Sequence, residues 1–359
     1  MPSIATHYIF SQDVLLKVST SSHIIPTIIN KALGAFMAGA QGPDIFFYDF
    51  VHLAVAKKKN NIGSHMHTSR TDTFFMNYVK EIFIQDCFDI PAVSAYIMGF
   101  LTHYSLDTAL HPYVYSVTTV RDNSKKAASA SLTAHCKLES DIDELIYYER
   151  FHTTINNANR NDFINITDDE IKSIAPVLCA SINKTYGCKL STAYIEGTFK
   201  RALFADNALQ DNHGLKKKIL EPVERKLTGA NVCSSLIFDT TLPDRACLNE
   251  GRKIWRDLAT NKLYTSSFYE LYEKAMKRAI SLILKYNVCI NNIYELCTVN
   301  NISMQDTPID YINTKPVTTS IIFSNDELAV SQLANSFVKE FGKATHGLSY
   351  HTGISWRKH

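Results

Sequence analysis

The chain has 359 residues, of which 45% are hydrophobic and 20% are charged, so it can bury a core and is not globally disordered. Its 37 basic and 35 acidic residues give a net charge of +2, which excludes a broad cationic surface for duplex nucleic acid. The eight cysteines include no CxxC pair, and their scatter favours free thiols over a zinc ribbon or a disulfide framework.

No segment of the sequence has the pattern of a targeting signal or a membrane span. The start, MPSIATHYIFSQDVLLKVST, lacks a basic region followed by an apolar one. The longest apolar run, AVSAYIMGFL (residues 92–101), is too short to cross a bilayer. No basic amphipathic helix stands out, and the basic tail SWRKH is too short to be an anchor. We therefore expect a soluble, cytoplasmic protein with at most peripheral membrane contact.

Helical patterns dominate the chain, which predicts an all-α fold. Residues 71–86 place aromatic and aliphatic side chains on one stripe of a helix. Thr167 and Glu170 have the spacing of a capping box, and Gly187 is a plausible end of the helix that follows.

The C-terminal part continues this pattern with one exception. Ser267 and Glu270 repeat the capping box before another amphipathic helix. The best strand candidate is VTTSIIF (residues 317–323), after a segment rich in turn formers. We expect one more helix over residues 324–342 and a loose tail beyond it.

Histidines and carboxylates recur at four-residue intervals in the N-terminal part. His103, Asp107 and His111 follow an apolar run, and this spacing places all three on one helix face. His135 and Glu139 repeat the pattern. Buried groups of this kind need partners, and two such pairs bring nitrogen and oxygen ligands that suit zinc.

Two local features qualify this prediction. Pro112 disfavours the helical conformation at the residue before it, so the helix should end near Leu110 or His111. His111 would then leave the helix axis and reach a different metal from the one held by His103. Asp44 follows a Gly-Pro turn, and on local evidence alone the simplest interpretation is a helix N-cap.

Several motifs together resemble the zinc-dependent phospholipase C family. In chain order they are THY, AFMAGAQGPDIFF, the MH of GSHMHTSR, GFLTHYSLDTALHPY, HCKLE and, more weakly, CLNEGRKIW. The resemblance implies a largely helical domain over residues 1–290 with a trinuclear-type zinc cleft. Residues 291–359 would then be a C-terminal extension.

The resemblance also implies a set of metal ligands, to be occupied by two or three zinc ions. The groups are Asp44, His67, His103 and Asp107 for one zinc, His111, His135 and Glu139 for a second, and His7 with a shared Asp107 for a third. His67 is preferred over His65 because the Met-His pair is what matches, whereas His23 and His52 match nothing.

Two departures from the family pattern concern the spacing and the third zinc. In secreted members, the third zinc also binds the amino group and carbonyl of a processed first residue. Here His7 lies near the start, and removal of Met1 would expose Pro2 in its place. The spacing from Asp107 to His111 is shorter than in the secreted enzymes.

The implied chemistry is hydrolysis of a phosphodiester by zinc-activated water, without a protein nucleophile. Asp44 is the candidate to bind zinc and to orient or deprotonate that water. The preferred substrate is a phospholipid, cleaved to diacylglycerol and a phosphorylated head group. Two alternatives remain open: a single-strand nuclease with a related zinc cleft, and a non-catalytic protein in which zinc only stabilises a binding surface. The sequence does not indicate the oligomeric state.

Overall fold

Helices make up most of the protein, as the sequence patterns predicted. The computed structural model describes residues 4–48, 61–120, 122, 124–229, 231–300 and 327–358. The longer helices are α1 (Ile4–Ser19), α2 (Ile24–Lys31), α3 (Leu33–Gly39), α5 (Ile62–Thr68), α6 (Thr71–Ile84), α7 (Pro91–Thr118), α8 (Lys125–Phe151), α9 (Asp168–Tyr186), α10 (Thr192–Leu209), α11 (Leu215–Thr228), α12 (Phe268–Asn300) and α13 (Glu327–Ala344).

Short elements connect these helices. The 3₁₀ turns are η1 (Gly42–Tyr48), η2 (Ile155–Asn157), η3 (Arg160–Asp162), η4 (Ser234–Leu236), η5 (Arg245–Leu248) and η7 (Trp356–Lys358). The strands β1 (Trp255–Arg256) and β2 (Leu263–Tyr264) form an antiparallel pair in which Trp255 lies opposite Tyr264. The predicted strand at residues 317–323 lies outside the described residues.

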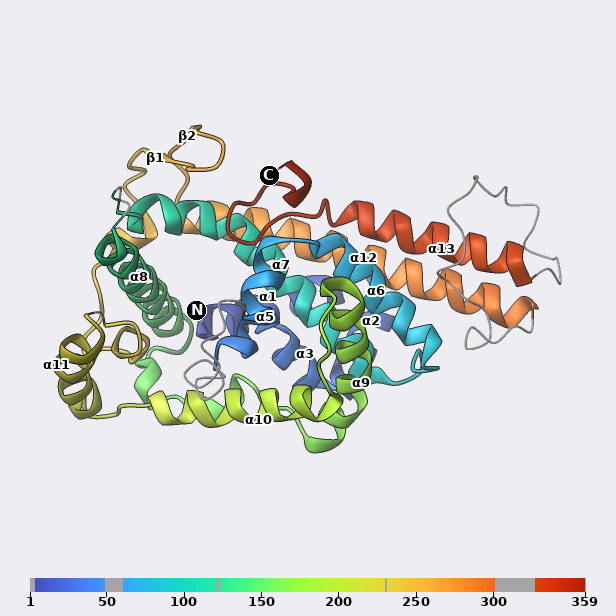
Figure 1. Ribbon diagram of the computed structural model, residues 1–359, viewed down its shortest axis with the longest axis horizontal. Coiled ribbons are helices and arrows are strands. Elements are labelled where there is room, and N and C mark those ends of the chain that lie inside the picture. The colour runs from blue at the N-terminus through green and yellow to red at the C-terminus, as the bar shows by residue number, and fades with distance from the viewer. Residues whose placement is uncertain are drawn as a thin grey trace.

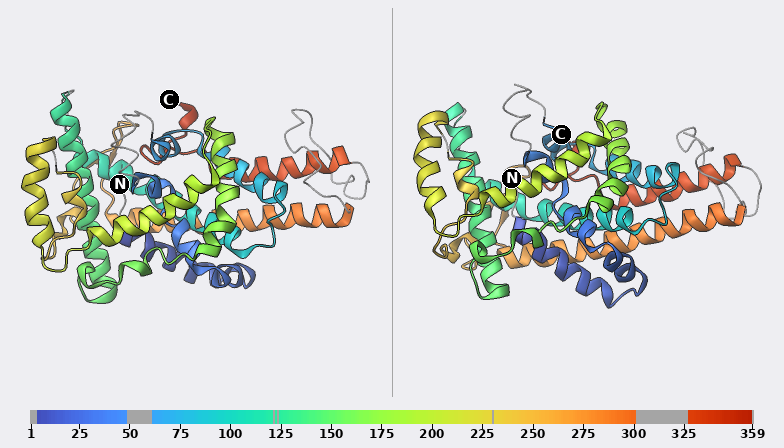
Figure 2. Two further views of the ribbon diagram at one scale, coloured as in Figure 1. Left: turned by 60° about the horizontal axis from the view of Figure 1, so that its bottom comes forward. Right: turned by 90° about the horizontal axis from the view of Figure 1, so that it is seen from below.

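The central element is α7, which is buried along nearly its whole length and contacts α1, α2, α3, α8, α9 and α12. Figure 1 shows it in the middle of the molecule, with α8 and α11 at one end. At the other end α12 and α13 lie side by side as a long antiparallel pair, which the views in Figure 2 also show. The approach of α3 to α7 is very close, since a Cβ at Gly99 would lie 2.0 Å from the carbonyl oxygen of Phe36. This contact brings η1, which follows α3, against the middle of α7.

The two predicted capping boxes and the helix end at Gly187 are confirmed. The helix predicted over residues 324–342 is present as α13, which continues to Ala344, while residues 324–326 lie outside the described part of the chain. The capping box of Thr167 and Glu170 begins α9, and Gly187 ends it in the left-handed conformation. The Ser267 backbone N–H donates to the Glu270 carboxylate at 2.9 Å at the start of α12. All eight cysteines are free.

Pro112 does not end its helix, and that prediction was wrong. Helix α7 continues through the proline to Thr118. Proline removes one N–H and disfavours, but does not forbid, a helical residue before it. Here Tyr113 and Val114 are buried beyond it, so tertiary packing outweighs the local preference. His111 therefore stays on the same helix face as His103.

The C-terminal tail is not loose, which corrects a second prediction. The Tyr104 hydroxyl donates to the Thr345 carbonyl at 2.7 Å and accepts from the Leu348 N–H at 2.6 Å. Tyr350 is fully buried, and its N–H donates to the His67 carbonyl at 2.9 Å. The segment thus covers the middle of α7. The boundary proposed near residue 290 falls inside α12, and the division into domain and extension stays a prediction.

No helix among the described residues is both long enough and apolar enough to span a membrane.

Candidate metal centre

Four elements bring the first set of predicted ligands together. His103 and Asp107 come from α7, His7 from α1, Asp44 from η1 and His67 from α5. All five side chains are buried. We call them the first cluster.

Asp44 reaches this cluster because of the turn before it. Gly42 has φ +54°, and a Cβ there would lie 2.3 Å from the ring of His103, so only glycine fits. The Asp44 carboxylate lies 3.0 Å from His67 Nε2 and 3.8 Å from His103 Nε2. Its partners are therefore imidazoles, in contrast to the helix N-cap that local evidence favoured.

Asp107 lies at the centre of the first cluster. One carboxylate oxygen is 3.1 Å from His7 Nε2, and the other is 3.2 Å from His103 Nε2. The second oxygen is also 3.8 Å from His67 Nε2. The rings of His7 and His103 stack with their centroids 4.2 Å apart. One ligand atom from each of His7, Asp44, His103 and Asp107 falls within 4.8 Å of the others, close enough to surround a cation.

The second cluster consists of His111 from α7 with His135 and Glu139 from α8. One Glu139 oxygen lies 3.1 Å from His111 Nε2 and 3.0 Å from His135 Nε2. His111 also lies next to the first cluster, with its Nδ1 3.5 Å from Asp107. The two clusters are thus neighbours that meet at Asp107 and His111.

Backbone carbonyls orient three of the histidines. Nδ1 of His67 lies 2.7 Å from the Gly63 carbonyl, and Nδ1 of His103 lies 3.2 Å from that of Ala40. Nδ1 of His111 lies 3.0 Å from the Tyr350 carbonyl. An Nδ1–H that donates to a carbonyl leaves a lone pair on Nε2, which is the usual arrangement for a metal-binding histidine.

In each of these histidines the Nε2 atom lies about 3 Å from a carboxylate oxygen. An Nε2 lone pair and a carboxylate oxygen repel each other at this distance unless a cation lies between the two atoms or the imidazole is protonated. In addition, Nε2 of His103 and Oδ2 of Asp107 are buried without a hydrogen bond among the described residues. Orphaned ligand atoms beside oriented imidazoles are what a metal centre requires. The residues present therefore fit zinc.

The pKa values describe the same balance of charge. Burial would raise the pKa of the Asp107 carboxyl, but His111 and His103 hold it well below its ordinary value. Burial would lower the pKa of His111, but Asp107 and Glu139 raise it to about 9. The carboxylates thus remain ionised in a buried site, where they attract positive charge.

A cavity of about 520 Å³ opens onto both clusters. Its charged wall contains Asp44, Asp107 and Glu139, and Phe47, Tyr115, Leu132 and Val232 contribute apolar surface. A ligand with a phosphate and an apolar portion can contact both kinds of wall at once.

His351 also lines this cavity, and sequence reasoning missed it. Its ring lies 5.5 Å from that of His67, 6.0 Å from that of His111 and 5.3 Å from that of Tyr115, measured between centroids. Burial lowers the pKa of His351 to about 3, so its ring is neutral at ordinary pH. No local pattern in the sequence marks it, because only the fold of the C-terminal segment brings it here.

Three histidines of the N-terminal part, His23, His52 and His65, were left outside the predicted ligand set. His65 is exposed beside the buried His67, and His23 is exposed on the surface. His52 lies outside the described residues.

Comparison with known proteins gives one result. A family model described as zinc dependent phospholipase C matches residues 6–188, about half of the chain. The eight residues predicted as ligands lie within this range. No curated protein and no solved structure matches significantly. The zinc-dependent family and the two buried clusters together are compatible with two or three zinc ions.

Proposed function

Because this chain belongs to the zinc-dependent phospholipase C family, we propose that it hydrolyses the phosphodiester of a phospholipid, releasing diacylglycerol and a phosphorylated head group. One observation carries the proposal: two carboxylate-histidine clusters that meet at Asp107 open into a cavity to which Phe47, Leu132 and Val232 add apolar wall.

In this proposal Asp44, His67, His103 and Asp107 would hold one zinc, and His111, His135 and Glu139 would hold another. His7 and Asp107 would hold a third. When bound, zinc neutralises phosphate charge and lowers the pKa of water towards about 7. The clusters lie side by side, so a phosphate can contact both.

The chain's own residues then orient the substrate and move the proton. Asp44 lies at the edge of the first cluster and also lines the cavity, so its carboxylate can accept a proton from water at the phosphate. Its pKa is lowered, because His103 and His67 outweigh the effect of burial, and it is therefore ionised. Phe47, Leu132 and Val232 supply apolar contacts for the glycerol and acyl portion.

Asp44→Asn tests this mechanism. Asparagine preserves shape but is a poor base and a weaker zinc ligand, so turnover on a choline phospholipid should fall by about 10²- to 10⁴-fold. Zinc content and thermal midpoint should be measured beside the rate, because a folded, zinc-loaded variant isolates the catalytic role. Near-normal turnover would remove Asp44 from the mechanism.

The same preparation separates the alternatives. Zinc-loaded wild type that cleaves single-stranded DNA, and no phospholipid, would support a nuclease. Protein that binds zinc but cleaves neither substrate would support the non-catalytic interpretation.

A further inference from the structure

Helix α11 is packed with its polar side inward and its apolar side outward. Leu215, Ile219, Val223 and Leu227 follow one another at four-residue spacing and are 59%, 67%, 49% and 78% exposed. A surface helix ordinarily buries such a stripe. We call these four side chains the α11 stripe.

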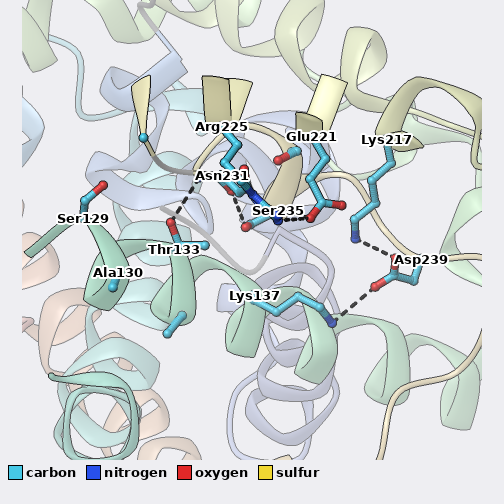
Figure 3. A pocket seen from close by; sticks show the side chains of 13 residues that line it. Ser129, Ala130, Thr133, Lys137, Lys217, Glu221, Arg225, Asn231, Ser235 and Asp239 are labelled. Carbon is cyan, nitrogen blue, oxygen red and sulfur yellow. Dashed lines mark hydrogen bonds and ion pairs between the residues drawn. The ribbon is translucent and has the colours of Figure 1, made fainter. Parts of the chain in front are cut away.

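The inward side of α11 is held by charges and hydrogen bonds. Figure 3 shows Lys217, Glu221 and Arg225 pointing into the pocket between α11 and α8. Lys217 pairs with Asp239 at 2.7 Å, and Lys137 of α8 pairs with the same carboxylate at 3.3 Å.

Glu224 fixes the same side of the helix. Its carboxylate accepts from the N–H groups of Cys233 and Ser234 at 2.7 and 2.8 Å, and from the Ser234 hydroxyl at 2.8 Å. Lys217 and Glu221 each lie two positions from two residues of the stripe, which is about 200° around the helix, so their contacts hold the stripe towards solvent. The outward apolar face is therefore built into the fold.

We propose that the α11 stripe docks the protein on the surface of a phospholipid bilayer. This inference deepens the proposed function and rests on it for the choice of a lipid partner. The stripe is about 18 Å long, since its ends are twelve residues apart, and it turns by about 120° around the helix because each four-residue step advances about 40°. An apolar face of this width fits a helix that lies in the surface of a flat apolar layer.

The charge of α11 agrees with a lipid partner. The helix contains five basic and two acidic residues. Both acidic side chains, Glu221 and Glu224, bond to groups on the protein side. Lys218 and Lys226 are exposed and complement anionic head groups. A second copy of the same helix would bring like charges together, which disfavours self-association through this face.

The position of α11 would bring a lipid substrate close to the cavity of the metal centre. Figures 1 and 2 show α11 beside α8 at one end of the molecule. Leu132 of α8 lines the cleft and is 48% exposed, and Val232, which follows α11 closely in the chain, lines it too. When the protein docks through α11, only the neighbouring helix α8 separates the lipid surface from the cavity of the metal centre.

The test compares glutamate substitutions on and off the stripe. Zinc-loaded full-length protein would be sedimented with vesicles of equal parts phosphatidylcholine and phosphatidylserine. We expect Ile219→Glu and Leu227→Glu each to weaken vesicle binding by about tenfold or more, the scale of one buried aliphatic side chain. Ile24→Glu on α2 is the matched control, since Ile24 is also an exposed helical isoleucine, at 59%. It should leave binding within about twofold.

A second readout separates this inference from the proposed function. Ile219→Glu should hydrolyse monomeric dibutyroylphosphatidylcholine as wild type does, while losing activity on vesicles in proportion to binding. Vesicle binding that is unchanged in Ile219→Glu, or lost equally in Ile24→Glu, would overturn the docking role. A wild-type dimer that Ile219→Glu dissociates would overturn it as well, because a second copy would then cover the stripe. Stripe-dependent binding without hydrolysis of either lipid would support docking and contradict the phospholipase.

Discussion

The first and second clusters contain the same kinds of side chain but are assembled differently. The first draws its residues from α1, η1, α5 and α7, and the carbonyls of Gly63 and Ala40 orient two of its histidines. The second uses two helices, and the carbonyl that orients His111 comes from Tyr350 in the C-terminal segment. The carbonyls that orient His67 and His103 thus come from the N-terminal part, whereas the carbonyl that orients His111 comes from the chain end. The chain end touches the first cluster as well, but through the Tyr350 N–H that donates to the His67 backbone carbonyl.

The largest effect should come from the residue at the junction. Asp107→Asn keeps the volume but removes the charge that faces His7, His103 and His111. We expect the loss of about one zinc ion or more per chain, and a fall of several degrees in thermal midpoint, because bound metal stabilises the folded state. Elemental analysis beside His65→Ala, an exposed control, measures this. Equal zinc in both variants would show that Asp107 is not a bridge.

A substitution in the second cluster should be smaller in effect and confined to one site. Glu139→Gln removes the charge shared by His111 and His135. About one zinc ion per chain should be lost while the first cluster keeps its own, since none of its oriented histidines contacts Glu139. Titration with a zinc chelator would resolve the two classes of ion. Loss of all zinc would mean that the clusters are not separable.

The dependence on the chain end can be tested away from the metal. Asp72 on α6 accepts from Trp356 Nε1 at 2.8 Å and from Arg357 at 2.6 Å. Asp72→Ala should release this anchor and weaken zinc at the second cluster by about tenfold, the scale of lost support for a ligand. Asp72→Asn retains an acceptor for Trp356 and serves as the control. An Asp72→Ala protein with unchanged affinity at both sites would remove the contrast between the clusters.

The smallest effect concerns a buried carboxylate that faces no histidine. Burial raises the pKa of Glu144 on α8 to about 7, and outweighs the Ile155 backbone N–H and the charge of Arg160, which lower it. Because the pKa of Glu144 is higher in the folded state than in the unfolded state, the protonated side chain favours folding. This stabilisation is complete below about pH 4.5, and it is lost as the pH rises from there through 7.

Relative to Glu144→Gln, wild type should therefore lose about 1 kcal/mol between pH 5 and 7.5, a figure reduced for solvent screening. Urea unfolding at several pH values measures it. Parallel pH curves for the two proteins would refute the raised pKa.

Local spacing predicted which of these side chains lie together, because residues four positions apart on a helix lie on the same face. His103 with Asp107, and His135 with Glu139, needed only that geometry. Pro112 misled the prediction because packing around α7 outweighs a local preference. His351 had no signal at all, since its place depends on contacts with residues far away in the sequence.

The expectation that no basic amphipathic helix stands out was wrong for α11, and its orientation also escaped prediction. The sequence LKKKILEPVERKLT has an apolar side and a charged side, but its periodicity does not say which of the two faces the protein. Only the bonds of Glu224 and the pairing of Lys217 with Asp239 decide this. The domain boundary near residue 290 and the roles of individual ligands remain predictions.

The contact between His111 and Tyr350 also sets an order of assembly. The two residues are 239 positions apart, so this hydrogen bond closes one of the longest loops in the molecule. During synthesis every predicted ligand, from His7 to Glu139, leaves the ribosome long before Tyr350 does. All the predicted ligand residues are therefore synthesised before His111 can be oriented. The second cluster reaches its final geometry only when the C-terminal segment has packed on α7.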